Sequence, residues 1–442
     1  MQKTALQIIK TLKAAGHEAY LAGGCVRDIL MKRDPTDYDI ATSAKPEEIE
    51  KLLEKTIPIG KQFGVILALQ NGFQFEIATF RSDSGYSDGR RPDAVLFTSP
   101  KEDAKRRDFT INALFYDTEE KKVIDFVKGQ KDLKAKVIDF VGDPEERIKE
   151  DHLRLIRAIR FKNALGFQYH PETYKAICKY SHLIKKVSPE RLGQELNKIM
   201  TAPCDKAAAF EDMFDSGVLQ HILPEIARMK GVAQPYEYHQ EGDVFAHTMA
   251  ALRSLGAKKV HNEVAWAVLL HDVGKPDTFK IAERIRFDGH VEKSAELAQE
   301  ILKRLRFSGQ KRDQITWLVA HHMLLVPLLE MPLGRQRHWL LHPWFEDLLQ
   351  VHKADAEGSL PVDLELYHKV KNLLEETKQK LPQLPPKLIA GDELIKKFKL
   401  KEGKEVGRLL DLLHYAQLEE RVNNKKQAWE FLEEHLKPEI LR

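Results

Sequence analysis

The chain of 442 residues is too long for one ordinary hydrophobic core, and its length predicts three or four domains. Hydrophobic residues make up 43% and charged residues 31%, with no apolar run as long as a membrane span, which indicates a globular, water-soluble protein. The formal net charge is only +3, so attraction to nucleic acid has to come from local basic patches. The three cysteines, Cys25, Cys178 and Cys204, are unclustered, which argues against a disulfide framework and fits a reducing cytoplasm.

Residues 1 to about 130 alternate between helix and strand patterns. The N-terminal segment has the pattern of an amphipathic helix and lacks the features of a secretory signal. The strand pattern EAYLA, a short helix and the strand pattern DYDIAT follow, and then a helix at residues 46–55. Asn71-Gly72 separates two further strand patterns, GVILALQ and FQFEIATF, which predicts a β-hairpin. We therefore expect a small mixed α/β sheet with helices packed against it.

Two aspartates one residue apart form the most informative motif in this part of the chain. Side chains at i and i+2 of a strand point to the same face, so we expect Asp37 and Asp39 to converge on one point. Clustered carboxylates suit Mg²⁺, which takes its remaining ligands from water and substrate phosphates. Backbone N–H groups at Gly23 and Gly24 could approach a triphosphate without side-chain obstruction. Together these features outline a nucleotidyl-transfer site, whereas a lone Asp-x-Asp motif would more simply be a solvated strand end.

Residues 81–93 are rich in Ser, Gly, Asp and Arg and include Arg90 and Arg91. Their low apolar content predicts a mobile loop. The strand pattern VLFT that follows is expected to resume the sheet.

From about residue 145 onward helical periodicity replaces the strand patterns. In the helix predicted at residues 150–165, Asp151 and Arg154 lie three residues apart on the polar face. A carboxylate that accepts from an exocyclic amino group, with a guanidinium that donates to a ring nitrogen, would admit cytosine and adenine and reject uracil and guanine. We therefore expect these two side chains to address one base edge together. The alternative is a solvated, salt-bridged helix face on which Glu150 pairs with Arg154.

The second set of chemistry-bearing residues is rich in histidine and lies in a helical region. Imidazole and carboxylate ligands suit Mn, Fe, Ni, Zn or Mg, so the pattern leaves the identity of a metal open. Structural retention of a metal without turnover is the alternative. The set consists of His247, His271, Asp272, His290, His321, His322 and Asp355.

In this order, the motifs resemble the class II, bacterial-type tRNA nucleotidyltransferase and poly(A) polymerase family with a fused HD phosphohydrolase-like domain. The resemblance is dense over the first two hundred residues and looser beyond them. It implies catalytic roles for Asp37 and Asp39 and selection of ribonucleotides by Asp108, which would accept from a 2'-OH. The nucleotide-binding residues that it implies are Gly23, Gly24, Arg27, Arg106, Arg107, Asp108, Asn112, Asp151, Arg154 and Arg157.

The resemblance also implies a metal site and a domain order. The core metal ligands that it implies are His247, His271, Asp272 and Asp355, and His290, His321 and His322 could hold a second ion with Asp272 bridging. The implied domains are a nucleotidyltransferase head at residues 1–140, a helical base-templating and RNA-binding neck at 141–225, a helical HD domain at 226–365 and a helical tail at 366–442.

The function implied by this resemblance is the addition of C, C and A to tRNA 3' ends from CTP and ATP, without a nucleic-acid template. The expected cofactors are Mg²⁺ and a divalent metal of unknown identity in the HD domain, and the expected partners are tRNA, CTP and ATP. We expect a cytoplasmic location, no membrane association and no obligate protein partner. A poly(A) polymerase or A-adding enzyme is the alternative within the family, and the full-length loop at residues 81–93 disfavours an enzyme limited to CC addition. An RNA-binding HD phosphohydrolase with an inactive transferase domain is the alternative from another class.

Overall fold

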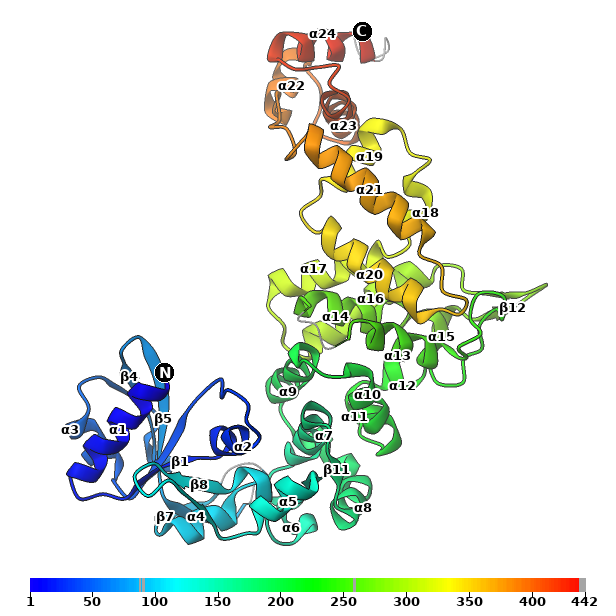
Figure 1. Ribbon diagram of the computed structural model, residues 1–442. Coiled ribbons are helices and arrows are strands. Elements are labelled where there is room, and N and C mark those ends of the chain that lie inside the picture. The colour runs from blue at the N-terminus through cyan, green and yellow to red at the C-terminus, as the bar shows by residue number, and fades with distance from the viewer. Residues whose placement is uncertain (87–88, 90–91, 257–259, 437–442) are drawn as a thin grey trace. The chain divides into compact units, whose positions relative to one another are not determined.

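The computed structural model describes residues 1–86, 89, 92–256 and 260–436. The chain forms two compact units, Met1–Ala227 and Arg228–Arg442 (Figure 1). The first unit is mixed α/β and the second is almost entirely helical, which confirms the expected fold class. The finer division of the chain into four domains stays a prediction.

A seven-stranded mixed sheet forms the amino-terminal part of the first unit, with the strand order β3-β4-β5-β2-β1-β8-β9. Only β2 and β5 pair in parallel, and the other neighbours are antiparallel. The strands are β1 (Ala19–Ala22), β2 (Asp39–Thr42), β3 (Thr56–Gly60), β4 (Val65–Gln70), β5 (Phe73–Thr79), β8 (Leu114–Asp117) and β9 (Lys122–Asp125). The helical elements here are α1 (Gln2–Ala14), α2 (Gly24–Leu30), α3 (Pro46–Leu52), η1 (Lys61–Phe63), α4 (Pro100–Arg106), η2 (Thr110–Asn112) and α5 (Gly129–Ala135).

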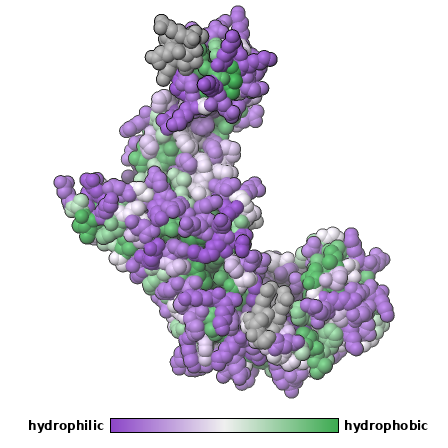
Figure 2. All heavy atoms as spheres, turned by 180° about the vertical axis from the view of Figure 1, so that it is seen from behind, coloured by the Kyte–Doolittle hydropathy of each residue, from purple (hydrophilic) through white to green (hydrophobic). Residues whose placement is uncertain are grey.

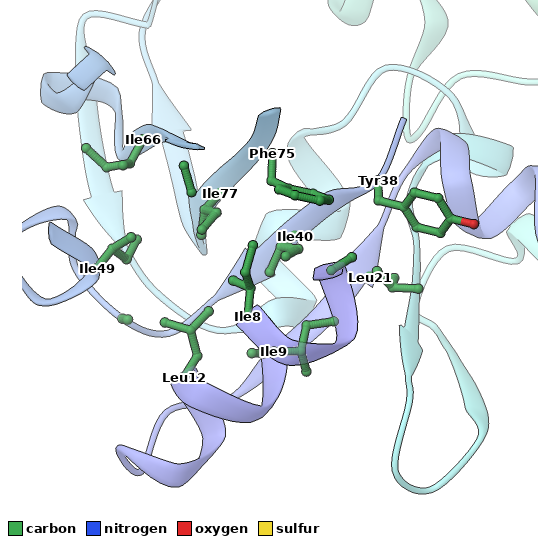
Figure 3. Packing of buried hydrophobic residues seen from close by; sticks show 14 of the residues in the cluster. Ile8, Ile9, Leu12, Leu21, Tyr38, Ile40, Ile49, Ile66, Phe75 and Ile77 are labelled. Atoms are coloured by element: carbon green, nitrogen blue, oxygen red, sulfur yellow. The ribbon is translucent and has the colours of Figure 1, made fainter. Parts of the chain in front are cut away.

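One face of this sheet is covered by α1, whose apolar residues recur at helical spacing. Ile8, Ile9 and Leu12 are fully buried and share a core cluster with Ile40 of β2 and Ile77 of β5 (Figure 3). Because side chains alternate along a strand, the residues next to Ile40 and Ile77 point away from this core. The opposite face of β2 carries other groups, among them Ala41, which lies in a second apolar cluster.

The predicted hairpin at Asn71-Gly72 is confirmed. Gln70 of β4 pairs with Phe73 of β5, and Asn71 and Gly72 both have positive φ, 51° and 77°. Two consecutive positive φ values are those of the type I′ turn that Asn-Gly favours.

The loop predicted at residues 81–93 is partly a strand. β6 (Arg81–Ser84) pairs with β7 (Ala94–Phe97) in a separate two-stranded sheet, so the VLFT segment does not resume the main sheet. Arg90 and Arg91 lie outside the described residues.

Helices make up the rest of the first unit, with one short parallel pair, β10 (Val137–Ile138) and β11 (Gln168–Tyr169). The helix predicted at residues 150–165 does not begin at Glu150. Helix α6 ends at Glu150 and α7 begins at Arg154, because the Asp151 carboxylate accepts from the backbone N–H of Leu153 and closes a turn. The helical elements are α6 (Pro144–Glu150), α7 (Arg154–Leu165), α8 (Pro171–Tyr180), η3 (Ser181–Lys186), α9 (Pro189–Thr201), α10 (Lys206–Asp215), α11 (Leu219–Ile222) and α12 (Pro224–Ala227).

The second unit is built around α14, where every residue from Val264 to Leu270 is buried. Helices α13, α17 and α20 pack against it, and three helices at the carboxyl end, α22 to α24, share a separate core. The helices are α13 (Val244–Ser254), α14 (Asn262–Leu270), α15 (Lys275–Thr278), α16 (His290–Arg304), α17 (Gly309–Ala320), α18 (Leu325–Leu328), α19 (Leu333–Leu340), α20 (Phe345–Gly358), α21 (Glu365–Lys380), α22 (Gly391–Phe398), α23 (Lys404–Leu418) and α24 (Lys425–His435). Two short strands, β12 (Lys280–Ile281) and β13 (Ile285–Arg286), pair as a hairpin in the described part of this unit.

The face of the molecule drawn in Figure 2 is mainly polar. Hydrophilic residues cover most of the face drawn in Figure 2, with smaller apolar patches between them. Within the described ranges, no helix combines the length and the apolar character needed to cross a membrane.

Candidate functional site

Two carboxylates meet on the face of the first unit's sheet that points away from α1, and a third precedes the sheet in the chain. Ile40 and Ile77 are partners in the parallel β2–β5 ladder, so Asp39 and Glu76, one residue earlier on each strand, are neighbours on the opposite face. Asp37 precedes β2, so the expectation that it lies within the strand is wrong, but its charge still acts on Asp39. Burial, followed by the charges of Asp37 and Glu76, raises the pKa of Asp39 to about 6. A divalent cation would relieve this repulsion, so the three carboxylates fit a metal site.

Glu76 was missed by the sequence analysis. The available signal was its place in the alternating pattern FQFEIATF, in which a single acidic residue lies between buried positions. That pattern marks an outward-facing residue, but only the register of β5 beside β2 brings it to Asp39.

Gly23 lies directly before α2 with φ of 74°, a value that favours glycine. A Cβ built there would lie 3.1 Å from Nη1 of Arg107 and 3.8 Å from Oδ2 of Asp39. Gly23 therefore brings the backbone close to two expected site residues, where a side chain would crowd them.

The adjacent arginines Arg106 and Arg107 share one buried carboxylate. Asp103 is 1% exposed and binds Nη2 of Arg106 at 2.7 Å and Nη2 of Arg107 at 3.0 Å. Burial alone would raise the pKa of Asp103, but the two guanidinium groups hold it below its ordinary value. The sequence analysis missed Asp103, which fixes both arginines from one turn earlier on α4.

A second polar network links Arg27, Asn112, Asp108 and Arg157. Arg27 Nη1 donates to Oδ1 of Asn112 at 2.7 Å, and Asn112 Nδ2 lies 3.4 Å from Oδ1 of Asp108. Asp108 also accepts from Nε of Arg157 at 3.0 Å. Arg27 and Asn112 are buried, so they support Asp108 from behind. The carboxylate of Asp108 is thus already positioned by Arg157.

The expected base-reading couple does not share one helix, because Asp151 lies in the turn between α6 and α7. Its Oδ2 binds Nη2 of Arg191 on α9 at 2.8 Å. Arg154 is 7% exposed, and its Nη1 donates to Glu150 at 2.6 Å and to the carbonyl of Arg147 at 2.8 Å. The Glu150–Arg154 pair of the alternative interpretation is therefore present, but Arg154 is buried and its face is not a solvated one.

One cavity of about 380 Å³ brings most of the expected transferase residues together. Its volume lies within the range of roughly 300–1,000 Å³ usual for small-molecule sites. Five other expected residues are not part of the lining of this cavity: Gly23, Gly24, Arg27, Asp37 and Asn112. The charged residues that line it include Asp39, Glu76, Arg106, Arg107, Asp108, Asp151, Arg154, Arg157 and Arg191.

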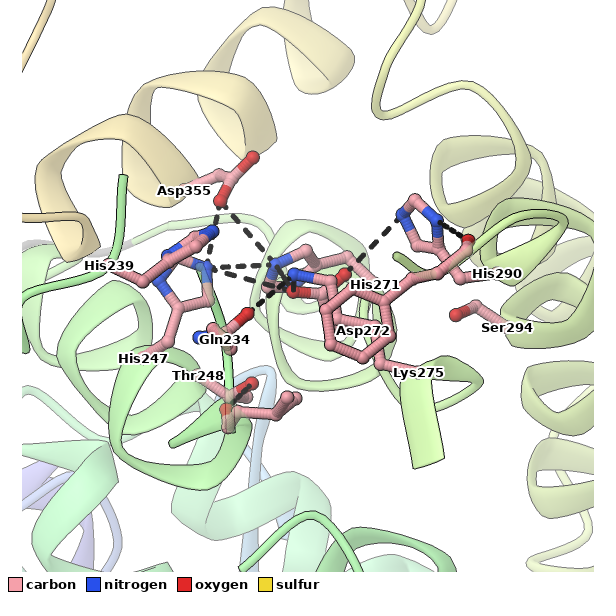
Figure 4. Close-up of polar contacts among 12 residues, drawn as sticks. Gln234, His239, His247, Thr248, His271, Asp272, Lys275, His290, Ser294 and Asp355 are labelled. Atoms are coloured by element: carbon pink, nitrogen blue, oxygen red, sulfur yellow. Dashed lines mark hydrogen bonds and ion pairs between the residues drawn. The ribbon is translucent and has the colours of Figure 1, made fainter. Parts of the chain in front are cut away.

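The histidine-rich set of the second unit forms a buried cluster. His247 Nε2 lies 2.9 Å from Oδ1 of Asp355 and 3.3 Å from Nε2 of His271, and Oδ2 of Asp272 lies 3.2 Å from Nε2 of His271 (Figure 4). The ligand atoms of His247, His271 and Asp355 all lie within 4.8 Å of one another. Two imidazole nitrogens this close need a shared proton or cation between them, which fits a metal site.

A second group of possible ligands adjoins the first. Asp272, His290 and His322 also bring one ligand atom each within 4.8 Å of one another. The two oxygens of Asp272 face different groups: Oδ2 faces His271, and Oδ1 lies 3.7 Å from Nε2 of His290. This arrangement is compatible with the expected bridging role of Asp272.

The direction of each ring supports metal binding. Nδ1 of His271, His290 and His322 lies 2.8–2.9 Å from the backbone carbonyls of Val268, Phe287 and Val319. A carbonyl only accepts, so the proton is on Nδ1 and the lone pair of Nε2 faces the cluster. That is the tautomer that a metal ligand requires.

The charges around His271 also support metal binding at the cluster. Burial alone would lower the pKa of His271, but Asp272 and Asp355 raise it to about 10. Without a metal, the buried Asp272 and the half-buried Asp355 therefore favour a second proton on His271, at Nε2, and a bound divalent ion would take the place of that proton.

Gly274 explains how His290 reaches the cluster. A Cβ built on Gly274 would lie 2.5 Å from the backbone nitrogen of Ser294 and 2.8 Å from the carbonyl of His290. Its N–H donates to Oγ of Ser294 at 2.9 Å. Only glycine allows α16 to approach the His271-Asp272 turn this closely.

His321 is not placed with these ligands, which corrects the expectation that it helps to hold a second ion. Its Nδ1 lies 2.7 Å from the carbonyl of Trp317, and its ring packs against Trp317 and Trp339 at centroid distances of 4.5 and 5.1 Å. Adjacent residues at the end of α17 point to different sides, so only His322 faces the cluster.

The structure adds two groups around the cluster that the sequence analysis missed. Oε1 of Glu241 lies 2.9 Å from Nδ1 of His247 and 2.7 Å from Nδ1 of His239, so Glu241 orients His247 toward the cluster. Burial alone would raise the pKa of Glu241, but these hydrogen bonds lower it to about 2. Lys275 Nζ donates to Gln234 and pairs with Oδ2 of Asp272, both at 2.7 Å.

Comparison with family models finds three matches along the chain. Residues 19–139 match the poly A polymerase head domain, residues 166–230 the probable RNA and SrmB-binding site of polymerase A, and residues 244–341 the HD domain. Three segments of the chain thus match models of a poly A polymerase head, its probable RNA-binding site and an HD domain, which confirms the resemblance.

Curated relatives and a solved structure extend this similarity. The chain is 42% identical over 230 residues to the CCA-adding enzyme of Anoxybacillus flavithermus, covering 52% of this chain and 57% of that protein. It is 39% identical over 271 residues to the CCA-adding enzyme of Bacillus subtilis, covering 61% and 64%. The chain thus spans about three fifths of the length of these relatives. The structure of the Bacillus stearothermophilus CCA-adding enzyme in complex with CTP aligns with a TM-score of 0.72 and 27% identity, over 98% of this chain and 96% of that one.

The raised pKa of Asp39 gives a prediction about stability. The carboxyl of Asp39 has a higher pKa in the folded chain, about 6, than in the unfolded chain. As the pH rises from the unfolded-state pKa toward about 6, the unfolded chain loses this proton more easily than the folded one, so the fold is destabilised. Asp39→Asn should therefore stabilise the metal-free first unit by on the order of 2 kcal/mol at pH 8, and the gain should vanish near pH 4. Thermal unfolding in EDTA measures this, with exposed Asp34→Asn as the control. If Asp39→Asn unfolds at pH 8 at the same temperature as the wild type or at a lower one, the raised pKa of Asp39 is contradicted.

The Glu241–His247 contact gives a second prediction. Glu241→Gln removes the charge that orients His247, so the affinity of the second unit for a divalent metal should fall by roughly ten- to a hundredfold. Titration calorimetry with Mn²⁺ measures the affinity, and exposed Glu237→Gln serves as a control of equal charge change. Wild-type affinity in Glu241→Gln would remove this orienting role.

Proposed function

We propose that the chain is a CCA-adding tRNA nucleotidyltransferase, which extends tRNA 3' ends with C, C and A from CTP and ATP. The observation that carries this proposal is the single cavity in which Asp39 and Glu76 meet the arginines and the couple formed by Asp151 and Arg154. The similarity to curated CCA-adding enzymes supports it, although the matched stretch covers only part of those relatives. The CTP named with the aligned structure is the kind of substrate that this cavity would bind.

The catalytic residues in this proposal are Asp37 and Asp39, with Glu76 as a third carboxylate. Their mutual repulsion fits Mg²⁺, which prefers oxygen ligands. Bound there, Mg²⁺ would supply charge neutralisation for the triphosphate and lower the pKa of the primer 3'-hydroxyl. The sheet fixes the carboxylates before substrate arrives, since Asp39 and Glu76 are on paired strands.

The arginines of the cavity would hold the triphosphate and the ribose. Arg106 and Arg107 are held in place by Asp103, and each keeps N–H donors for phosphate oxygens. Asp108, positioned by Arg157, would accept from the ribose 2'-OH and so select ribonucleotides. Gly23 and Gly24 leave room for the substrate to approach the backbone.

Asp151 and Arg154 would select the base. Arg191 and the N–H of Leu153 fix the Asp151 carboxylate, which keeps further lone pairs for an exocyclic amino group. Arg154 Nη1 is occupied by Glu150 and Arg147, while Nε carries a further N–H donor for a ring nitrogen. Both side chains are thus held rigidly enough to distinguish C and A from U and G without a template strand.

The buried cluster of the second unit supports a second activity, hydrolysis of a phosphate ester. Two adjoining ligand groups joined by Asp272 fit two divalent ions, whose identity the ligand types leave open. Bound there, such ions would supply Lewis-acid stabilisation for both the attacking and the leaving oxygen. This activity would let the protein process damaged tRNA 3' ends before it rebuilds them.

The proposal also includes tRNA, CTP and ATP as partners, with the RNA held mainly through its phosphates and shape. A cytoplasmic location belongs to the same proposal, and the three free cysteines are compatible with it.

The direct test of the transferase uses a tRNA transcript that lacks its 3' end. With CTP and ATP together, the product should be three nucleotides longer at single-nucleotide resolution, and Asp37→Ala should lower the rate by on the order of a hundredfold or more, about 3 kcal/mol of transition-state stabilisation. Asp34→Ala, an exposed aspartate of the same segment, should keep the rate. A ladder with ATP alone would instead indicate poly(A) synthesis, and absence of any incorporation would favour an RNA-binding phosphohydrolase.

Base selection is tested by Arg154→Ala. Loss of one charge-assisted hydrogen bond, about 1.5–3 kcal/mol, should lower discrimination against UTP and GTP by roughly ten- to a hundredfold. Glu150→Gln keeps the guanidinium but removes its charged partner, so it should retain selectivity even if it lowers stability. Competition among mixed nucleotides measures both variants, and unchanged selectivity in Arg154→Ala would leave the arginine a structural role alone.

The second activity is tested by Asp272→Ala. The variant should lose bound transition metal and any hydrolysis of a 2',3'-cyclic nucleotide, while CCA addition stays largely unchanged because its carboxylates lie in the other unit. Metal analysis and a phosphate-release assay report the two effects, with exposed Asp313→Ala as the control. Unaltered metal content in Asp272→Ala would contradict the ligand assignment. Bound metal without hydrolysis in the wild type would favour a metal with a structural role alone.

A further inference from the structure

We propose that the buried cluster of the second unit acts on RNA 3' ends of at least two nucleotides, and that Arg284 and Arg286 bind the phosphate upstream of the reacting one. This inference rests on the proposed phosphohydrolase activity and names its substrate class.

The cavity beside the cluster is larger than a single nucleotide needs. Its volume is about 1020 Å³, at the upper end of the roughly 300–1,000 Å³ usual for small-molecule sites. Asp272, His290, His322 and Asp355 form part of its lining, so a phosphate placed at the cluster lies inside this cavity. The remaining volume would accommodate a second nucleotide.

Two arginines line the same cavity from the β12–β13 hairpin. Arg284 lies in the turn directly before β13 and Arg286 lies in β13, and both residues line the cavity. Both are exposed, and neither has a side-chain ion pair within the described part of the chain. Lys275, which also lines the cavity, is instead buried and paired with Asp272. The two arginines are therefore the cations of this wall that remain available for a phosphate. The planar guanidinium group of arginine matches the geometry of phosphate oxygens.

The other walls suit nucleobases and ribose. Phe287, Met323 and Val326 give the lining apolar surface, and Tyr238, 63% exposed, offers a ring on which a base could stack. Asp363 supplies a carboxylate that could accept from a ribose hydroxyl. The cavity thus combines apolar, cationic and acceptor surfaces, the mixture that a short RNA presents.

A mononucleotide would leave the arginines without a partner. In a 2',3'-cyclic mononucleotide the only phosphate is the reacting one, which belongs at the metal ligands. There the oxygen of water forms a bond to phosphorus, the bond from phosphorus to one ribose oxygen breaks, and the proton of water passes to that oxygen. In a dinucleotide the internucleotide phosphate adds one negative charge for Arg284 and Arg286 to bind.

The test compares two substrates that share their reacting nucleotide, using the full chain with Mn²⁺. These are adenosine 2',3'-cyclic phosphate and the dinucleotide CpA ending in a 2',3'-cyclic phosphate. We expect kcat/KM to favour the dinucleotide by about tenfold or more, the equivalent of one charge-assisted contact. The double variant Arg284→Ala/Arg286→Ala should lose this preference and keep the rate on the mononucleotide. Lys280→Ala, an exposed cation of the same hairpin outside the cavity lining, should keep the preference.

A binding measurement separates failure of this inference from failure of the proposed activity. Calorimetry with CpA ending in a 3'-phosphate should show affinity that falls by about tenfold in the double variant, whether or not the cluster hydrolyses either substrate. Hydrolysis of the mononucleotide with no preference for the dinucleotide would overturn the inference and leave the activity in place. Absence of both arginine-dependent binding and preference would overturn it as well.

Discussion

Mutual repulsion among carboxylates is the constraint on which the proposed transferase site depends. Asp39 and Glu76 are forced together because the core residues next to them, Ile40 and Ile77, pair in the β2–β5 ladder. Burial, and after it the charges of Asp37 and Glu76, raise the pKa of Asp39 to about 6, so the fold holds this carboxylate at a cost to its own stability. The same crowding makes the site attractive to a divalent cation. Each arginine in the described lining of the cavity is in turn paired with a carboxylate, so the cavity is preorganised for a charged substrate.

The histidine cluster follows the same logic with different ligands. Backbone carbonyls hold the Nδ1 proton of His271, His290 and His322, and Glu241 holds that of His247, so the remaining nitrogens face one centre. Close packing at Gly274 lets α16 approach the His271-Asp272 turn, which brings His290 to the cluster. In the first unit, packing places carboxylates that repel one another close together. In the second unit, hydrogen bonds turn imidazole nitrogens toward one another. Both arrangements suit a bound cation.

Local patterns in the sequence predicted the elements and the residue types, but not the partners that cross between elements. The Asn71-Gly72 hairpin and the face of α1 follow from short-range rules, and both are confirmed. The helix predicted across residues 150–165 is broken because the Asp151 side chain competes for a backbone N–H, a choice that periodicity does not encode. Glu76 and Glu241 reach their sites through strand register and chain return, so no spacing in the sequence marks them. His321 was included with His322 because adjacent residues look equivalent in a sequence, although they point to different sides of a helix end.

The central claim is that side chains of one cavity both bind the nucleotide and choose its base. A crystal structure with CTP and Mn²⁺, phased on the anomalous signal of manganese, tests it most directly. We expect a manganese peak in contact with Asp39 and the triphosphate. We also expect the cytosine amino group within hydrogen-bond distance of Asp151 and the cytosine N3 facing Arg154. A triphosphate bound away from Asp39, or a cytosine edge that contacts neither Asp151 nor Arg154, would contradict it.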